Sequence, residues 1–313
     1  MFEWHIKPSL LWASAGIILL LILGTVIIAF LSHQNPEKDF SELRARLRSW
    51  WWMAGIFILA MLIDPVISLV LFGFLSFLAL KEYLSLIPTR RADRRVLFWA
   101  YLAIPVQYYW IGIAWYGVFI IFIPIYMFLL LPIRMILIGE TEGFLRAAGT
   151  LHWGLMTTVF CLSHAAYFLA LPEEGNPIAG GAGLLLFLVF LTEFNDVSQY
   201  VWGKLLGKHK IIPKVSPNKT WEGFLGGLVT TTLLAALVAP LLTPLILWQS
   251  VFAGVLIASA GFFGDVSISA LKRDLAIKDS GNLLPGHGGI LDRVDSLTYT
   301  APLFFHFVYY LHY

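Results

Sequence analysis

The sequence predicts an all-α fold, a polytopic bundle of nine to ten transmembrane helices that forms a single integral membrane domain over residues 1–313. Three observations support this prediction. Hydrophobic residues make up 59% of the chain, and the mean hydropathy is +0.79. Several apolar runs reach the roughly 20 residues that a helix needs to cross a bilayer, and one of them, Leu10–Leu31, carries no charge. The charged residues gather in a few short connections, as expected where charge inside a span costs free energy.

Ten apolar segments are candidate helices. The first is expected to be retained, because no small-residue cleavage site of a signal peptide follows it. The second is short, and Asp64-Pro65 would make its turn into the third, since proline restricts the residue before it and ends helices. The ten segments are 9–31, 50–63, 65–87, 96–112, 114–134, 150–171, 180–203, 221–241, 246–271 and 294–311.

The basic residues orient these helices. Of the 21 lysines and arginines, 19 fall at alternate connections and the adjoining helix ends, and the other connections contain none. The positive-inside rule places the basic connections in the cytoplasm and both chain termini outside. The sequence therefore predicts an integral membrane protein, which in a bacterial cell would lie in the inner (plasma) membrane. The basic segments are 33–49, 88–95, 204–219 and 272–293, together with Arg134 and Arg146.

The first chemistry-bearing region joins the seventh and eighth candidate helices. Asp196 lies late in an apolar span, where an ionisable side chain needs a partner, a cavity or a metal. The segment 204–219 holds five lysines, most of which a basic surface facing anionic headgroups would explain. Ser216 or Thr220 can cap the next helix, and a helix N-terminus beside Lys219 is suited to binding phosphate.

The second region surrounds the ends of the last two candidate helices. Asp265, Ser269 and Lys272 fall on one helical face, at i, i+4 and i+7. Asp292 and Asp295 follow at the start of the next helix, so two helix ends bring carboxylates together. Mg²⁺ is held by a few carboxylates together with substrate phosphates, which makes this pattern typical of a nucleotide site.

A glycine-flanked histidine lies between those two helix ends. Gly288 and Gly289 let backbone N–H groups approach a phosphate closely, as in anion-binding nests. His287 can donate a hydrogen bond or move a proton. A glycine-rich loop is weak evidence alone, but here it is accompanied by the bases Lys272, Arg273, Lys278 and Arg293.

Other polar residues in apolar segments have plainer interpretations. Cys161 is the only cysteine, so no intrachain disulfide can form, and a core position is expected for it. His164 and His306 are expected to be hydrogen-bonded core residues. Glu82 follows Lys81 near a helix end, which favours a local ion pair. Nucleic-acid binding does not fit a chain of this composition.

The residues from Ser269 to Asp295 resemble the signature of the CDP-diacylglycerol synthases, also called phosphatidate cytidylyltransferases. They read SALKRDLAIKDSGNLLPGHGGILDRVD. The run from Ser216 to Gly223, SPNKTWEG, is similar to a second marker of that family. The resemblance covers residues 190–296 well, and the N-terminal half is similar mainly as a set of hydrophobic spans.

The resemblance implies the reaction of CTP with phosphatidate, giving CDP-diacylglycerol and pyrophosphate on the cytoplasmic side of the membrane. It implies Mg²⁺ held by Asp265 and Asp292, with Asp196 matching a further acid and K⁺ as a second cation. The basic residues, with His287, would surround the CTP phosphates and the lipid headgroup. The implied catalytic residues are Asp265, Asp292, Lys272, Arg273 and His287, and the implied substrate-binding residues are Ser216, Lys219, Lys278, Gly288, Gly289 and Arg293.

Two departures from the family pattern leave the lipid acceptor open. The chain has Asp196-Val-Ser-Gln-Tyr200 where bacterial members usually show Asp-Ser/Thr-Gly-Ala-Tyr, and Ile268 where they tend to carry Glu. A paralogue that uses another lipid phosphate is one alternative, and a catalytically silent homologue is another. An ion-coupled transporter is a third, from a different class, and it would explain Asp196 but not the glycine-flanked histidine. Monomer and homodimer both remain open.

Overall fold

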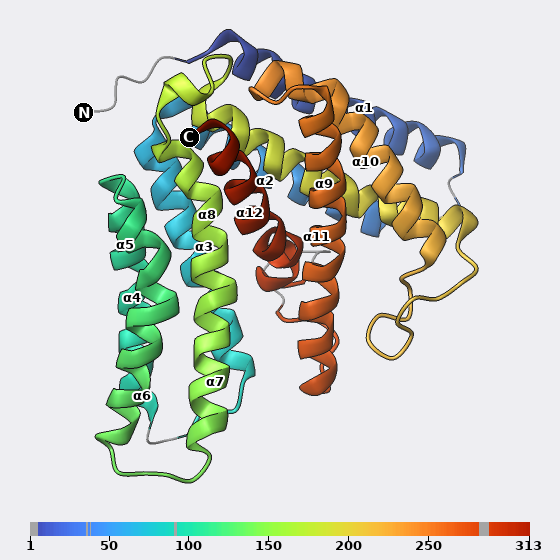
Figure 1. Cartoon of the computed structure of the whole chain (residues 1–313). Coiled ribbons are helices and arrows are strands. Elements are labelled where there is room, and N and C mark those ends of the chain that lie inside the picture. The colour runs from blue at the N-terminus through green and yellow to red at the C-terminus, as the bar shows by residue number, and fades with distance from the viewer. Residues whose placement is uncertain (1–5, 36, 38, 91–92, 282–287) are drawn as a thin grey trace.

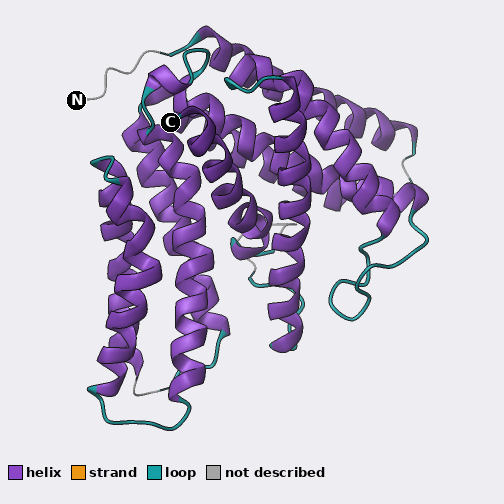
Figure 2. Ribbon diagram, in the orientation of Figure 1, coloured by secondary structure: helices purple, strands orange, loops and turns teal. Residues whose placement is uncertain are grey.

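A computed structural model describes residues 6–35, 37, 39–90, 93–281 and 288–313, and within them it is all-helical (Figure 2). Ten continuous helical segments are present in this part of the chain, as the sequence predicts. Two of them are composite, because short π-helical and 3₁₀ turns interrupt them. The α-helices are α1 (Pro8–Gln34), α2 (Ser41–Ile63), α3 (Pro65–Leu86), α4 (Arg94–Gly112), α5 (Tyr116–Ile121), α6 (Phe128–Ile136), α7 (Phe144–Leu155), α8 (Leu162–Tyr167), α9 (Gly180–Leu206), α10 (Trp221–Leu242), α11 (Leu247–Asp274) and α12 (Leu291–His312).

The π-helical turns have identifiable causes. The turn η2 (Phe122–Met127) links α5 to α6 and contains Pro124, whose missing N–H breaks the regular hydrogen-bond pattern. The turn η3 (Met156–Cys161) links α7 to α8, which continues into the 3₁₀ turn η4 (Phe168–Ala170). In η3, Thr157 and Thr158 hydroxyls donate back to Trp153 and Gly154 carbonyls, a contact that bends helices.

Two helices begin well before the sequence predicts. The second begins at Ser41 rather than at residue 50, because the polar stretch before the apolar run continues the same helix. The helix predicted over 150–171 begins at Phe144, where Gly143 in the left-handed region (φ +65°) starts it. In both cases the helix extends beyond the apolar segment that marks a span in the sequence.

Eight helices of the described chain are long and apolar enough to cross a membrane, and they mark the chain as an integral membrane protein. The prediction of nine to ten spans therefore exceeds what length and composition support. The two helices that fall short are α4, which begins with two arginines, and α12, which begins with Asp292, Arg293 and Asp295.

The C-terminal helices pack against one another. Helix α10 packs against α9 and α11, and α11 packs against α12 (Figure 1). Helix α12 also contacts α8 and η3, whereas α1 lies along the outside against α2, α9 and α10. The connection between α9 and α10, residues 207–220, projects at the lower right of Figure 1. We call this connection the lysine loop.

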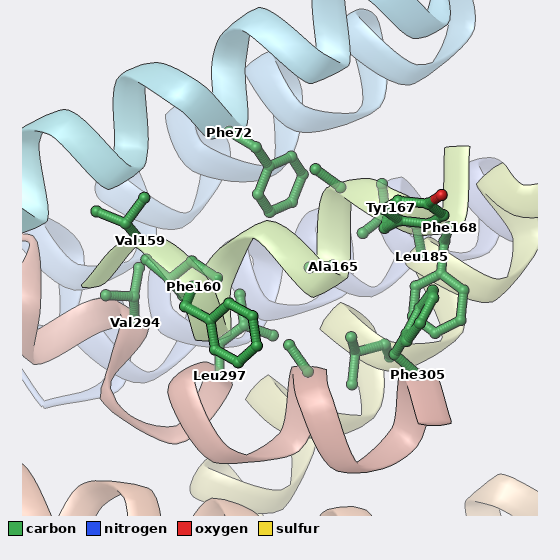
Figure 3. Packing of buried hydrophobic residues seen from close by; sticks show 14 of the residues in the cluster. Phe72, Val159, Phe160, Ala165, Tyr167, Phe168, Leu185, Val294, Leu297 and Phe305 are labelled. Carbon is green, nitrogen blue, oxygen red and sulfur yellow. The ribbon is translucent and has the colours of Figure 1, made fainter. Parts of the chain in front are cut away.

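The hydrophobic core fixes the start of α12. Val294 and Leu297 of α12 gather with Val159 and Phe160 of η3, as Figure 3 shows. All four side chains are buried, with Val159 fully so. Because Asp292 and Asp295 lie on the first turns of this same helix, the packing that holds α12 also sets the position of their carboxylates.

The plain interpretations of two histidines are confirmed. His164 is fully buried and its Nδ1 lies 2.8 Å from the Phe160 carbonyl oxygen. His306 Nδ1 lies 2.7 Å from the Pro302 carbonyl oxygen. Both hydrogen bonds are to the preceding helical turn, so these side chains belong to the aromatic core rather than to a site.

Candidate functional site

Five of the predicted charged residues, Asp196, Asp265, Lys272, Asp292 and Arg293, border a cavity of about 810 Å³, which we call the main cavity. Helices α9, α11 and α12 supply its acidic side chains, and the loop after α11 supplies one more. Three bases stand among them, so both signs of charge are present. The acids are Glu193, Asp196, Asp265, Asp279, Asp292 and Asp295, and the bases are Arg46, Lys272 and Arg293.

The part of the lining that comes from the first two helices is largely apolar. Leu43, Arg46, Leu47 and Trp50 of α2 line it, and Ile28 of α1 lies beside them. The four α2 residues are spaced i, i+3, i+4 and i+7, so they form one helical face. Leu43, Arg46 and Leu47 lie in the N-terminal part of α2 that the sequence does not predict to be helical, whereas Trp50 begins the predicted segment. The cavity thus combines an apolar wall with a strongly charged one.

A second cavity of about 510 Å³ lies under the lysine loop, and we call it the side cavity. It shares Asp196, Tyr200 and Asp265 with the main cavity. Its other polar residues come from α9 and from the loop, and they include Gln199, Lys204, Lys210, Ser216, Asn218 and Lys219. The two cavities therefore meet at Asp196 and Asp265, with bases on both sides.

Lys219 joins the lysine loop to these carboxylates. Its Nζ lies 2.6 Å from Asp265 Oδ2 and donates to Gln199 Oε1 at 3.2 Å. The ammonium also lies 5.6 Å from the centre of the Phe262 ring. Burial works against the charged form, but Asp265 and Asp196 outweigh it and raise the pKa of Lys219 above its usual value. Lys219 therefore stays charged between the two cavities.

The lysine loop is held in shape by its own backbone and by Glu222. Lys210 and Thr220 form an antiparallel bridge, and the Glu222 carboxylate accepts from the His209 N–H and contacts its Nδ1 at 2.5 Å. Of the two predicted caps, Thr220 is the one that caps α10: its hydroxyl accepts from the Gly223 N–H at 3.2 Å. Ser216 instead lines the side cavity. This closed loop gives Lys219 a defined position.

Asp292 is the most fully hydrogen-bonded of the predicted acids. Its Oδ1 accepts from Lys272 Nζ at 2.6 Å, and its Oδ2 accepts from the N–H and hydroxyl of Ser280 at 2.9 and 2.8 Å. The Gly289 N–H donates to Oδ2 at 3.2 Å. Gly288 has φ +78°, and a Cβ there would lie 2.7 Å from Oδ2, so only glycine fits. Gly289 thus binds the protein's own carboxylate, and Gly288 leaves space for it.

The residue that the sequence interpretation missed is Glu82. It does not form the predicted local pair with Lys81, because its carboxylate faces the start of α12. It accepts from the N–H groups of Ile290 and Leu291 at 2.9 and 3.0 Å and from the Ser280 hydroxyl. The one sequence signal was an acid within an apolar span, which calls for a partner but does not name it.

The structure brings most of the predicted site residues together, with three exceptions. Arg273 points to the lysine loop, where its Nε donates to the Val215 carbonyl at 3.1 Å. Lys278 is exposed and is absent from the linings of both cavities. His287 lies outside the described residues. The predicted residues that line a cavity are Asp196, Ser216, Lys219, Asp265, Lys272, Gly288, Asp292 and Arg293, while Gly289 lies behind Asp292.

The shared region contains carboxylate oxygens, the donors that a divalent cation prefers. Asp196 Oδ1 is enclosed and accepts no hydrogen bond from the described residues, so the protein itself leaves this oxygen unsatisfied. Ser269 donates to Asp265 Oδ1 at 3.2 Å, as its spacing on α11 predicts. Within the described part of the chain, no three histidine, cysteine or acidic side chains already converge as metal ligands. Lys219 and Lys272 instead neutralise Asp265 and Asp292.

The chain was compared with known proteins. The model of the Cytidylyltransferase family matches residues 44–311. Uncharacterized protein YnbB of Escherichia coli is 47% identical over 296 residues, which is 95% of this chain and 97% of that protein. A phosphatidate cytidylyltransferase of Staphylococcus saprophyticus is 38% identical over 161 residues, and one of Haemophilus influenzae is 39% identical over 136 residues. These two matches span 59% and 47% of the relatives' own lengths.

Proposed function

Because this chain belongs to the cytidylyltransferase family, we propose that it transfers a cytidylyl group from CTP to a lipid phosphate. Phosphatidate is the first candidate acceptor, and the products are then CDP-diacylglycerol and pyrophosphate. The partial similarity to phosphatidate cytidylyltransferases supports this choice. In this proposal the protein contributes to the synthesis of phospholipids.

The observation that carries the proposal is the meeting of two unlike cavities at Asp196 and Asp265. The side cavity is lined by lysines and hydroxyls, which suit a triphosphate. The main cavity has an apolar wall from α2 and a charged wall from α9, α11 and α12, which suits a lipid with an anionic headgroup. Two substrates that enter by different routes would bring their phosphates together at the shared carboxylates.

In the proposed reaction, a phosphate oxygen of the lipid attacks the α-phosphorus of CTP. The new P–O bond forms as the bond from the α-phosphorus to the bridging oxygen breaks, and pyrophosphate leaves with that electron pair. The lipid phosphate is already anionic, so the attack needs no strong general base. Catalysis of such a transfer consists mainly of positioning and of neutralising the developing charge. We assign that role to Lys219, Lys272 and Arg293, which line the two cavities.

A divalent cation fits this donor set. Mg²⁺ prefers carboxylate and phosphate oxygens, and bound here it would polarise the phosphoryl group. We propose that Asp196, Asp265 and Asp292 hold it, and that Lys219 and Lys272 move from the carboxylates to the substrate phosphates. The enclosed Oδ1 of Asp196 supports this assignment. K⁺ as a second cation remains a proposal that depends on the family resemblance.

The departures from the family pattern affect the acceptor more than the reaction. Val197 lines the main cavity, and Gln199 lines the side cavity and accepts from Lys219. Ile268 is buried and lies outside both linings, so that replacement is a change of core packing. The second candidate function is therefore cytidylyl transfer to a lipid phosphate other than phosphatidate, which the full-length similarity to YnbB also leaves open.

The proposal also covers the side of the membrane that the site faces and the choice between a transferase and a transporter. We propose that the site faces the cytoplasm, because the lysine loop and the loop after α11 are both basic connections. A transporter would leave the alignment of lysines and carboxylates at two joined cavities unexplained. If CTP with Mg²⁺ protects the purified protein against thermal unfolding, this result would support the transferase and oppose the transporter.

The direct test incubates the purified protein with labelled CTP, Mg²⁺ and a panel of lipid phosphates. The proposal expects a CTP-dependent lipid product, whose identity names the acceptor. Asp265→Ala and Asp292→Ala are each expected to abolish its formation. Substantial turnover in both variants, or no product with any lipid phosphate, would overturn the proposal.

A further inference from the structure

The N-terminus of α12 is capped by a residue of α3. The first N–H groups of a helix have no partner within it, and the side chain of the N-cap residue, Ile290, cannot accept a hydrogen bond. Glu82 supplies the missing acceptors: Oε2 takes the Ile290 N–H at 2.9 Å and Oε1 takes the Leu291 N–H at 3.0 Å. A carboxylate in this place also complements the positive end of the helix dipole.

The position of Glu82 is itself fixed. Its neighbour Tyr83 is 1% exposed, and the Tyr83 hydroxyl donates to the Thr150 carbonyl oxygen at 2.8 Å. Helix α7 approaches this ring so closely that a Cβ on Gly154 would collide with it. The last turn of α3 is therefore anchored to α7, and Glu82 projects from a rigid support.

The backbone around Ser280 and Gly289 is shaped to admit this carboxylate. A Cβ on Gly289 would collide with Glu82 Oε1, and one on Gly281 would lie 3.0 Å from Oε2. The distance at Gly281 is tighter than most real contacts of a Cβ atom, and the collision at Gly289 leaves no room for any side chain. The glycines at these two positions thus make space for a protein carboxylate.

Ser280 links Glu82 to Asp292. The Ser280 hydroxyl is within hydrogen-bond distance of Glu82 Oε1 and lies 2.8 Å from Asp292 Oδ2. A hydroxyl has one proton, so it donates to one of these carboxylates at a time. Asp292 lines the main cavity, whereas Glu82 is absent from that lining and stands one residue further back.

We infer that Glu82 is a positioning residue for the proposed transferase site. It holds the start of α12 and, through Ser280, the carboxylate of Asp292, so that the acids of α11 and α12 face the same cavity. The inference rests on the proposed function for its catalytic consequence, but not for its structural one. Glu82 does not touch the reacting atoms, and it acts through the residues that do.

The test compares Glu82→Gln with the matched control Lys81→Gln, which changes the exposed neighbouring side chain. Hydrogen–deuterium exchange of the peptide covering Ile290–Asp295 is the readout that needs no activity. Glu82→Gln replaces one carboxylate oxygen by an amide donor that opposes a backbone N–H, so exchange there is expected to rise about tenfold. The control should exchange as the wild type does.

Kinetics provide the second readout. Glu82→Gln is expected to lower kcat about 10- to 100-fold and to raise the Mg²⁺ concentration for half-maximal turnover, with the KM for CTP little changed. Glu82→Asp keeps the charge and should recover part of the loss. Ser280→Ala should show the same dependence on Mg²⁺, and combining it with Glu82→Gln should add little.

The outcomes separate the two proposals. If the wild type makes no lipid product, the proposed function fails, and the exchange experiment still decides whether Glu82 holds α12. The inference would be overturned if Glu82→Gln stayed within about twofold of the wild type both in the exchange rate of Ile290–Asp295 and in the Mg²⁺ concentration for half-maximal turnover. Loss of an important supporting contact produces larger changes than that. A loss of activity that merely follows a lower Tm, with the Mg²⁺ dependence unchanged, would also overturn it.

Discussion

Replacing Lys219 with methionine removes the positive charge that joins the lysine loop to the carboxylates of α9 and α11. The Lys219 and Asp265 side chains are only 19% and 25% exposed, and their charged atoms lie 2.6 Å apart. Removing one partner of a buried pair costs about 3–5 kcal/mol, and the partial exposure here lowers our expectation to about 2–4 kcal/mol. For a chain of this length, that corresponds to a fall in Tm of about 3–6 °C.

A double-mutant cycle in detergent separates the pair from its surroundings. Lys219→Met, Asp265→Asn and the combined variant are compared by thermal unfolding, with Lys214→Met as the control from the exposed part of the same loop. Removing both charges leaves neither one buried alone, so the double variant should be more stable than the sum of the single changes by about 1–3 kcal/mol. The control should leave Tm unchanged.

Additive effects of Lys219→Met and Asp265→Asn would refute this reasoning, because independent residues show no coupling. A fall in Tm for Lys214→Met equal to that of Lys219→Met would refute it as well. Such a result would mean that the loss of any lysine from the loop destabilises the protein. The position of Lys219 between the two cavities would then have no special importance.

Three further predictions follow from the same contacts. The pKa of Lys219 is raised in the folded protein, so its stabilising contribution is complete below the ordinary lysine pKa and is lost only as pH rises through the folded value. The Tm difference between the wild type and Lys219→Met should therefore stay constant from about pH 7.5 to pH 9. A difference that shrinks across this range contradicts the assignment. Chelation of Mg²⁺ should stop product formation, and added Mg²⁺ should restore it. Asp196→Asn should raise the Mg²⁺ concentration needed for half-maximal product formation about 10- to 100-fold. An unchanged Mg²⁺ requirement would show that Asp196 is not part of the cation site. Lys272→Ala should lower kcat/KM at least several-fold more than Arg273→Ala, because Lys272 contacts Asp292 while Arg273 binds the Val215 carbonyl of the lysine loop. Equal losses of kcat/KM, measured with labelled CTP, would show that Arg273 also reaches the substrate.

Local features of the fold could be predicted from the sequence, and the ends of helices could not. Apolar length places the spans, and Asp64-Pro65 marks a turn that the structure confirms, with Asp64 accepting from the Val66 N–H at 2.6 Å. The N-terminal part of α2 carries arginines among its apolar residues, so hydropathy alone does not show that the helix continues there. That missed segment gives the main cavity Leu43 and Leu47 of its apolar wall.

In the candidate site, contacts within one helix could be predicted from the sequence, and contacts between distant segments could not. Asp265, Ser269 and Lys272 share a helical face, so their proximity follows from the 3.6-residue period, and the Ser269–Asp265 hydrogen bond confirms it. The contact of Glu82 with Ile290 crosses 208 residues, and no local periodicity encodes such a distance. Arg273 follows Lys272 in the sequence, but successive helical residues point about 100° apart, so its Nε donates to the Val215 carbonyl of the lysine loop while Lys272 contacts Asp292.

The parts of the site that sequence patterns did not locate are those supplied by the N-terminal helices. The charged wall of the main cavity comes from α9, α11 and α12, whereas its apolar wall comes from α2 and from Ile28 of α1. Residues 44–311 match the family, so α1 contributes to the cavity from outside the matched region. A charged wall that performs a common phosphoryl chemistry can remain constant while an apolar wall changes to suit a different lipid. We therefore expect the choice of acceptor to respond to substitutions at Leu43, Leu47 and Trp50, and the transfer itself to respond to substitutions at Asp196, Asp265 and Asp292.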